Sequence, residues 1–222
     1  MSFGKNLQFL RRLRGNMTQE DLAEKLNVSR QTISKWELDS VQPEMDKAIE
    51  LCKLFSCTLD NLFREDMSAS SDAYTDLRVE TVPAFRYIKY AVISTDPESD
   101  AIDRIISIAR QYDVEDPHII GWDFSNLTVE QVNAFNMHGY EAAWVLPKGV
   151  EPDGHEIYEQ AEHKYAAVHI EDPFSDPFVT IPNGYKTLME YMRVNGLEHT
   201  DKDVIPCFET NGDTMDIYIA CK

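Results

Sequence analysis

Apolar side chains recur at three- and four-residue intervals through the first 65 residues, and this spacing predicts a series of short helices. The first carries Phe3, Leu7 and Leu10 on one side and stops at Gly15 and Asn16, a pair suited to a left-handed helix end. Further apolar stripes predict helices over about residues 19–26, 30–37, 45–55 and 59–63. The N-terminal segment is therefore expected to be helical throughout.

Two of these helices follow one another across a tight turn at Asn27 and Val28. Thr18 and Ser29 stand directly before them and are expected to be their N-caps. In the helix over 30–37, Ile33 and Trp36 face inward, which leaves a polar outer face rich in hydrogen-bond donors. Its members are Arg30, Gln31, Thr32, Ser34 and Lys35.

The run from Met17 to Glu37 strongly resembles the Xre-type, lambda-repressor-like helix-turn-helix family, and the resemblance covers about residues 4–64. It is carried by the capped helix pair, the small Ala23, the apolar Val28 and the inward-facing Ile33 and Trp36. The resemblance implies that the helix over 30–37 enters the major groove of double-stranded DNA.

Particular contacts follow from that resemblance. Gln reads adenine and Arg reads guanine through paired hydrogen bonds, so Gln31 and Arg30 are the expected base readers. Thr32 and Ser34 are expected at a base edge or a phosphate, Lys35 at a phosphate, and Gln19 at a phosphate beside a helix N-terminus. The alternative for each position is a solvated polar side chain without a DNA contact.

Residues 78–222 repeat a pattern of strand, helix, strand and strand. Lys89 to Asp100 and Lys164 to Asp176 share the letters KYA, an apolar strand and DPxSD. Helical stripes follow, and then pairs of strands; the ranges are 101–112 and 181–194 for the helices and 119–124, 140–145, 204–209 and 215–220 for the strands. The prediction is a multidomain chain: an all-α helix-turn-helix domain (1–66), a small, polar linker (67–77), and an α+β domain (78–222) of two pseudo-symmetric repeats with antiparallel sheet.

Charge supports this division. The whole chain has 39 acidic and 21 basic residues, a formal net charge of −18, which taken alone argues against a nucleic-acid partner. The first 35 residues, however, hold seven basic and only three acidic residues, whereas residues 67–222 hold 11 basic and 28 acidic ones. A basic reading domain is therefore followed by an acidic domain.

The closing stretch from Pro206 to Cys221 looks like the GyrI-like effector-binding family, and the resemblance covers about residues 78–222. It implies a cleft for a small molecule, lined by aromatic residues and containing a carboxylate at Glu209. The aromatic residues that fall on predicted strands, and are the expected ligand contacts, are Trp122, Trp144, Tyr165 and Tyr218. The alternative is that these aromatic residues only fill the core.

Strand alternation places Glu209 on one face with Ile205 and Cys207, and the first repeat carries Ile120, Trp122 and Phe124 in the matching stretch. A carboxylate on an apolar face is costly, because burial raises its pKa and a bound cation is needed to restore the charged form. The expected effector is therefore cationic or amphipathic.

Two classes of function result. The first is a homodimeric transcriptional regulator whose acidic domain senses a small molecule. The alternative is a GyrI-like hydrolase fused to a DNA-binding domain; it is less favoured because the sequence shows no nucleophile–base pair and has Thr210 where the family has a second acid. A third reading is a DNA-bound scaffold that makes only protein contacts.

No metal or cofactor site is predicted, since the four cysteines form no CxxC pair and His163 and His169 lie about 20 Å apart along one strand. The sequence has no apolar run of about 20 residues and no signal peptide, so we expect a cytoplasmic protein without a membrane partner.

Overall fold

The computed structural model describes residues 2–67, 73–125 and 127–222, and the chain divides into two compact units. The helical unit comprises Met1–Leu77 and Phe174–Glu198, and the sheet unit comprises Arg78–Pro173 and His199–Lys222. The predicted order of an α domain followed by an α+β domain is confirmed. One helix departs from the predicted division, because residues 177–195, expected within the C-terminal domain, pack in the helical unit.

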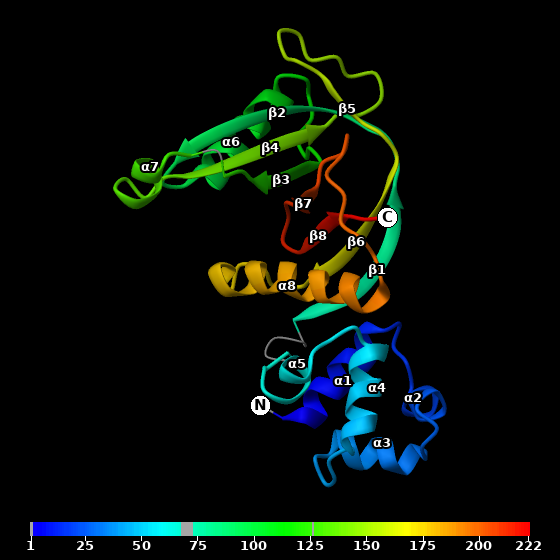
Figure 1. The fold of residues 1–222 in the computed structure, drawn as a ribbon. Helices are drawn as coiled ribbons and strands as arrows, with labels where there is room; N and C mark the ends of the chain where they lie inside the picture. The colour runs from blue at the N-terminus through cyan, green and yellow to red at the C-terminus, as the bar shows by residue number, and fades with distance from the viewer. Residues whose placement is uncertain (1, 68–72, 126) are drawn as a thin grey trace. The chain divides into compact units, whose positions relative to one another are not determined.

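Short helices around one apolar core build the helical unit. They are α1 (Phe3–Leu13), α2 (Gln19–Lys25), α3 (Arg30–Glu37), α4 (Met45–Leu54), α5 (Leu59–Phe63) and α8 (Pro177–Asn195), labelled in Figure 1. Leu7, Leu22, Ile33 and Leu51 are fully buried between them. Gly15 and Asn16 have φ angles of 64° and 54°, so the predicted left-handed end of the first helix is confirmed.

A buried asparagine closes the N-terminal bundle. Asn6 of α1 is 1% exposed, and its side-chain nitrogen donates to the carbonyl oxygens of Asn61, Leu62 and Glu65 at distances of 2.7–3.1 Å. Its side-chain oxygen accepts from the Met67 backbone nitrogen at 3.1 Å. One side chain thus satisfies the end of α5 and holds the chain that follows it.

An eight-stranded sheet has the order β1-β6-β8-β7-β3-β4-β2-β5. The strands are β1 (Tyr74–Val82), β2 (Phe85–Ser94), β3 (Ile119–Asp123), β4 (His138–Val145), β5 (Tyr158–Gln160), β6 (His163–Ile170), β7 (Cys207–Thr210) and β8 (Met215–Ala220) (Figure 1). Helix α6 (Pro97–Arg110) follows β2, and the short α7 (Val129–Asn133) precedes β4. The two predicted repeats are therefore β2-α6-β3-β4 and β6-α8-β7-β8.

The two repeats meet where β3 pairs antiparallel with β7, with Ile120 opposite Thr210 and Gly121 opposite Glu209. Each repeat is preceded by a strand that lies at the edge of the other repeat: β1 precedes β2 but neighbours β6, and β5 precedes β6 but pairs with β2. This exchange ties the repeats together at both edges of the sheet.

The segment predicted as a linker is partly a strand. β1 begins at Tyr74, so residues 74–77 belong to this strand, while residues 68–72 lie outside the described part of the chain. Asp76 within β1 has a φ of 48°, which breaks the regular pleat of this edge strand.

The structure contains the two predicted repeats, but the residues that correspond between them differ from the predicted alignment. Helix α6 begins at Pro97 with Asp96 as N-cap, and α8 begins at Pro177 with Asp176 as N-cap. The equivalent Asp-Pro pairs are thus 96–97 and 176–177, whereas the DPxSD match had paired the first with residues 172–173. Proline suits the first helical position because its missing N–H needs no partner there, and this places each helix start four residues before the predicted one.

Candidate nucleic-acid interface and effector site

Local capping positions the helices of the predicted DNA-binding segment. The Thr18 hydroxyl accepts from the Asp21 backbone nitrogen at 3.1 Å, and the Asp21 carboxylate accepts from the Thr18 backbone nitrogen at 2.8 Å. This reciprocal pair lowers the pKa of Asp21 through hydrogen bonds from Thr18. The Ser29 hydroxyl accepts from the Thr32 backbone nitrogen at 3.1 Å. Both predicted N-caps are confirmed.

The two sides of α3 differ as predicted. Ile33 and Trp36 are 0% and 4% exposed, and they pack against the buried Leu22 and Ala23 of α2. On the other side, Arg30, Gln31 and Lys35 are exposed and Thr32 and Ser34 are half-buried. A helix locked to its neighbour on one side therefore presents a polar surface on the other.

A buried ion pair at the end of α3 was missed by sequence reasoning. Glu37 is 6% exposed, and Arg11 of α1 donates from Nε to its Oε1 at 2.7 Å. Gln19, at the start of α2, donates from Nε2 to Glu37 Oε2 at 2.7 Å. One carboxylate thus joins α1, α2 and α3. Gln19, the predicted phosphate contact, lies at the N-terminus of α2, and its side-chain amide donates to this carboxylate.

The predicted DNA contacts differ in how they are held. Arg30 Nε lies 3.2 Å from Glu20 Oε2 in an exposed ion pair, and the Thr32 hydroxyl lies 2.9 Å from that of Ser29. Within the described part of the chain, no hydrogen bond to the side chain of Gln31 or Lys35 is found. These two side chains therefore need no rearrangement to contact a partner.

Glu209 is buried, as the sequence predicts, at 7% exposure. Its Oε1 accepts a hydrogen bond from the Tyr140 hydroxyl at 3.0 Å. Tyr140 lies on β4, so its side chain crosses β3 to reach β7, and Gly121 makes the crossing possible: a Cβ there would lie 2.1 Å from the Tyr140 oxygen. The sequence signal that was overlooked is the glycine inside an otherwise apolar strand.

The face that Glu209 occupies differs from the predicted one. It lies opposite Gly121, and thus on the face that also carries Ile119, Tyr140 and Trp144 and packs against α6. We call this the α6 face. Cys207 shares it, as predicted, but Trp122 does not. The predicted alignment of residues 119–124 with 204–209 is wrong by an odd number of residues. Successive side chains of a strand point to opposite faces, so an error of this kind assigns Glu209 to the wrong face.

Three of the four predicted aromatic contacts lie on the other side of the sheet. Trp122, Tyr165 and Tyr218 belong to a cluster with Tyr87 and Phe208, which we call the aromatic face. Tyr165 and Tyr218 are 0% and 9% exposed, and burial is the main cause that raises the pKa of each phenol. The predicted grouping of Glu209 with these three residues is therefore wrong, because the sheet separates them.

Trp144 lies on the α6 face but is completely buried. It packs among Ile88, Ile105 and Ala109, and its ring lies 6.2 Å from that of Tyr112. The indole Nε1 has no hydrogen-bond partner among the described residues. Trp144 therefore forms part of the core and leaves one buried donor unsatisfied.

The aromatic face also carries charged residues that the sequence did not single out. Lys89 Nζ lies 3.0 Å from both carboxylate oxygens of Glu141 and 5.1 Å from the Tyr158 ring centroid. Tyr158 stacks on Tyr87 at 5.5 Å, and burial together with Glu141 raises the pKa of Tyr87. Lys89 and Glu141 lie on neighbouring strands, so only the strand register reveals the pair.

A second charged group occupies the other repeat on the same face. Arg78 Nη2 donates to Asp216 Oδ2 at 3.1 Å and to the Tyr218 hydroxyl at 3.2 Å, and its Nε donates to Glu80 at 3.1 Å. His169 Nδ1 lies 2.7 Å from Asp216 Oδ1. Glu141 and Asp216 occupy matching positions in the predicted repeats, and each pairs with a cation that lies over a tyrosine ring.

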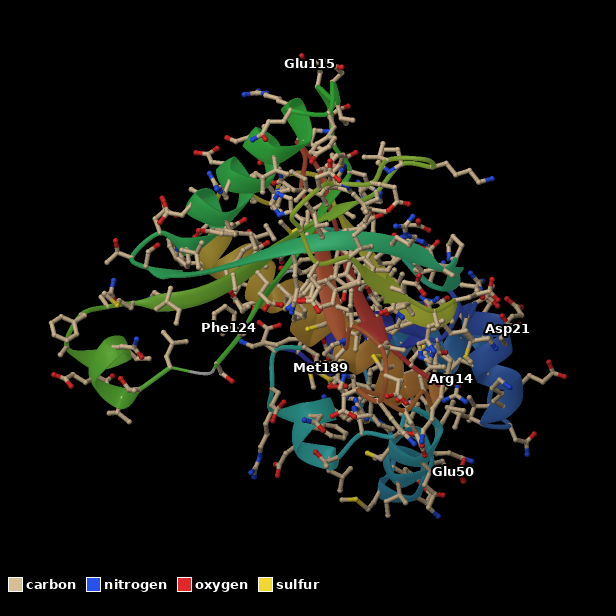
Figure 2. All side chains as sticks on the ribbon, turned by 90° about the horizontal axis from the view of Figure 1, so that it is seen from above. Arg14, Asp21, Glu50, Glu115, Phe124 and Met189 are labelled. Atoms are coloured by element: carbon tan, nitrogen blue, oxygen red, sulfur yellow. The ribbon has the colours of Figure 1, made fainter. Side chains whose placement is uncertain are left out.

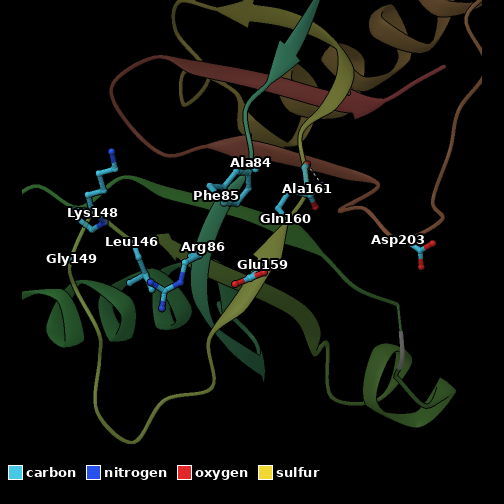
Figure 3. A pocket seen from close by; sticks show the side chains of 11 residues that line it. Ala84, Phe85, Arg86, Leu146, Lys148, Gly149, Glu159, Gln160, Ala161 and Asp203 are labelled. Atoms are coloured by element: carbon cyan, nitrogen blue, oxygen red, sulfur yellow. Dashed lines mark hydrogen bonds between the residues drawn. The ribbon is translucent and has the colours of Figure 1, made fainter.

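A pocket of about 640 Å³ opens at the β2–β5 edge of the sheet (Figure 3). Its lining includes Phe85, Arg86, Leu146, Lys148, Glu159, Gln160 and Asp203. Arg86 is engaged by Glu151 through two contacts of 2.7 Å. None of the five predicted ligand residues lines this pocket, but Phe85 links it to the aromatic face, since its ring lies 5.7 Å from that of Tyr87.

No group of three or more His, Cys, Asp or Glu residues that would hold a metal ion is found in residues 2–67, 73–125 and 127–222. Over the same ranges, no helix combines the length and apolar character needed to cross a membrane.

The capped pair α2–α3 defines a helix-turn-helix protein, and comparison with known proteins agrees. The helix-turn-helix family model HTH_3 matches residues 10–62. The HTH-type transcriptional activator BcrR of Enterococcus faecalis is 48% identical over 62 residues, which are 28% of this chain and 30% of that protein. ImmR of Bacillus subtilis, an HTH-type transcriptional regulator, is 35% identical over 82 residues, 37% of this chain and 63% of that protein.

A third relative is the HTH-type transcriptional regulator MJ0272 of Methanocaldococcus jannaschii. It is 44% identical over 48 residues, which are 22% of this chain and 73% of that protein. The chain therefore belongs to the HTH-type transcriptional regulators, with an Xre-type domain at its N-terminus. It spans only 30% and 63% of the lengths of the first two relatives.

Two solved structures align at low identity. The EcmrR–DNA complex matches 96% of this chain and 80% of that chain, with 16% identity and a TM-score of 0.49. SAV2435 bound to tetraphenylphosphonium matches 67% of this chain and 94% of that chain, with 13% identity and a TM-score of 0.39.

Proposed function

We propose that this chain is a sequence-specific transcriptional regulator: α3 reads operator DNA, and a small cationic or amphipathic effector bound by the sheet unit changes that reading. The observation that carries the DNA-binding part is the two-sided α3, buried through Ile33 and Trp36 and polar and exposed through Arg30, Gln31 and Lys35. The exposed side offers the groups that recognise adenine, guanine and phosphate.

Two recognition helices are needed to read two half-sites one turn of DNA apart, so the proposed regulator acts as a homodimer. Arg30 and Gln31 are the base readers in this proposal. Thr32, Ser34, Lys35 and Gln19 hold the backbone or a neighbouring base edge. Arg30 gives up its exposed ion pair with Glu20 on binding, which costs little because such surface pairs contribute only about 0–1 kcal/mol.

The effector part rests on the buried Glu209 and its neutral phenol partner Tyr140. A desolvated carboxylate favours a cationic partner. Trp144 stands on the same face, on the other side of β3, with an indole N–H that has no partner among the described residues. We therefore place the effector contact at Glu209 on the α6 face, where Trp144 is part of the core behind the contact and not a surface that the effector reaches. Trp122, Tyr165 and Tyr218 pack on the opposite, aromatic face of the sheet and do not contact the effector in this proposal.

Selection of duplexes from a random library by the full-length protein tests the DNA-binding part. The proposal expects an enriched sequence made of two inverted half-sites, and relaxed selection at single base positions for Arg30→Ala and Gln31→Ala. The exposed Lys53→Ala on α4 is the matched control and should select the same sequence as the wild type. Unchanged selection by Arg30→Ala and Gln31→Ala would place the reading surface elsewhere.

Calorimetry with tetraphenylphosphonium, used as a lipophilic cation probe, tests the effector part. Glu209→Gln should weaken binding at least about tenfold, equivalent to about 1.4 kcal/mol. Glu141→Gln, which neutralises a carboxylate on the aromatic face, is the control and should bind as the wild type does. Equal loss in both variants would move the site to the aromatic face, and a probe recovered with changed mass would favour the hydrolase alternative.

A further inference from the structure

The last turn of α8 is part of the core of the DNA-binding helices. Val194 is 1% exposed and belongs to the same apolar cluster as Leu7, Leu10 and Leu51, and Tyr191 packs against that cluster. Burying a valine side chain removes its apolar surface from water and thereby stabilises the fold. The end of α8 is therefore a structural component of the helical unit.

Hydrogen bonds join the C-terminal ends of α1, α4 and α8. Arg14, labelled in Figure 2, donates from Nη1 to the carbonyl oxygens of Leu54 and Val194, each at 2.6 Å. Asn195 Nδ2 donates to the Leu13 carbonyl at 3.0 Å, and Arg193 Nη1 donates to the Phe55 carbonyl at 3.1 Å. The last carbonyls of a helix lack partners within it, and cations are favourable there because of the helix dipole. Side chains of α1 and α8 thus donate hydrogen bonds to the last carbonyl oxygens of each other's helix.

The chain connects α8 directly to two strands of the sheet unit. The chain enters α8 from β6, which ends at Ile170, and leaves it toward β7, which begins at Cys207; both strands belong to the sheet unit. By sequence α8 is the helix of the second repeat, and by packing its last turn belongs with α1 and α4. Among the elements described above, α8 is the helix that one repeat of the sheet unit contributes to the DNA-binding core.

From the junction, a short route leads to the recognition helix. Leu13 and Arg14 lie at the end of α1, one turn after Arg11. Arg11 forms the buried pair with Glu37 at the end of α3. A displacement of α1 at its C-terminal end therefore acts on the side chain that fixes α3.

We propose that α8 is the coupling element between effector and DNA: effector occupancy of the sheet unit biases the position of α8, and the junction of Leu13, Arg14, Val194 and Asn195 passes this bias to α3. The inference rests on the proposed function and names its regulation. Because binding free energies are linked, DNA bound to α3 must bias α8 and the strands that flank it by the same amount.

Hydrogen exchange of the full-length protein, with and without the selected operator duplex, tests the coupling without an identified effector. In the wild type, the duplex should change exchange of the last turn of α8 and of β6 and β7 about fivefold or more. The test variant is Val194→Ala/Asn195→Ala, which removes the buried Val194 side chain and the Asn195–Leu13 hydrogen bond. It leaves the backbone carbonyl that accepts from Arg14, and it keeps α8 because alanine favours helix. It should still bind the duplex, but the change in β6 and β7 should be lost.

The control variant is Lys186→Ala/Met189→Ala, which replaces two exposed residues of the same helix and should respond as the wild type does. A duplex-bound wild type without a change in α8, or a junction variant that still transmits it to β6 and β7, overturns the coupling. Failure of the wild type to bind any duplex overturns the proposed function and the coupling with it. Should the junction variant fail to fold, Arg14→Lys, which keeps the charge but not the two-carbonyl contact, takes its place.

Discussion

The recognition helix and the Glu209 site both depend on one carboxylate, but they hold it differently. Glu37 at the end of α3 is neutralised by Arg11 and supported by Gln19, all within one small helical core. Glu209 accepts from a phenol that reaches it from two strands away across Gly121. The first carboxylate is paired with the guanidinium of Arg11, and the second accepts a hydrogen bond from the Tyr140 phenol.

This difference teaches what each carboxylate is suited to do. A buried ion pair is costly to break because either partner alone is left as an uncompensated charge, so Glu37 is suited to fixing geometry. We propose that Glu209, a buried carboxylate that accepts from the Tyr140 phenol, binds a cationic effector. The predictions below separate these roles, in order of decreasing effect.

Breaking the ion pair should have the largest effect. Arg11→Ala leaves the Glu37 carboxylate buried without its cation, and the free energy of unfolding of the helical unit should fall by about 3–5 kcal/mol. Urea unfolding followed by circular dichroism measures it. Arg12→Ala, one residue along on the exposed side of α1, should change stability by no more than about 0.5 kcal/mol. Equal effects of the two variants would show that the pair does not fix α3.

Filling the gap at Gly121 should have the next largest effect. Gly121→Ala places a methyl group against the Tyr140 hydroxyl and should cost about 1–3 kcal/mol of unfolding free energy. The methyl group would also lie 2.5 Å from the nearest Tyr140 ring carbon, so the clash is relieved only when the ring is removed. The double variant with Tyr140→Ala should therefore be more stable than the sum of the two single effects predicts. Gly212→Ala, whose new methyl group makes only an ordinary contact of 3.4 Å, is the control. Strict additivity would contradict the crossing of β3 by Tyr140.

Removing the local cap of α2 should have a smaller effect. Thr18→Ala loses the hydroxyl that accepts from the Asp21 backbone nitrogen and should cost about 1 kcal/mol. Thermal unfolding monitored in the helical unit measures this cost, and Thr18→Ser should restore most of the stability. A loss of 3 kcal/mol or more would mean that the cap also supports a longer-range contact.

The smallest expected effect concerns a thiol beside Glu209. Burial, and next to it the negative charge of Glu209, raise the pKa of Cys207. Glu209→Gln removes that charge, so the thiol pKa should fall and more thiolate should form at a given pH. Alkylation of Cys207 by iodoacetamide at pH 8, followed by mass spectrometry, should become faster, because the thiolate is the reactive form. Cys57, in the helical unit, should react at an unchanged slow rate because burial raises its pKa to about 12. An unchanged rate at Cys207 would contradict the effect of Glu209 on this thiol.

The helical half of the fold was predictable because its signals are local. Thr18 and Ser29 cap the helices that follow them within three residues, and Gly15 and Asn16 end α1 by their own backbone angles. The Xre-type pattern adds the buried side of α3. The order of strand, helix, strand and strand in each repeat was also predictable from alternation and spacing alone.

The candidate effector site was not predictable in detail, because it depends on strand register. The side of the sheet that Glu209 occupies follows from its pairing with Gly121, and a one-residue error in that pairing exchanges the faces. The Lys89–Glu141 pair has the same origin. The junction of Arg14 with Val194 joins residues 180 positions apart, and a local sequence pattern does not predict such a contact.

The most direct test of the central claim compares Gln31→Ala with Lys35→Ala in operator binding over a range of salt concentrations. Lys35→Ala should weaken binding to all sequences alike and reduce the slope of log affinity against log salt by about 1. Gln31→Ala should keep that slope but lose about 1–3 kcal/mol of discrimination at one base position. Two variants that both match the wild type in slope and in base preference would contradict DNA reading by α3.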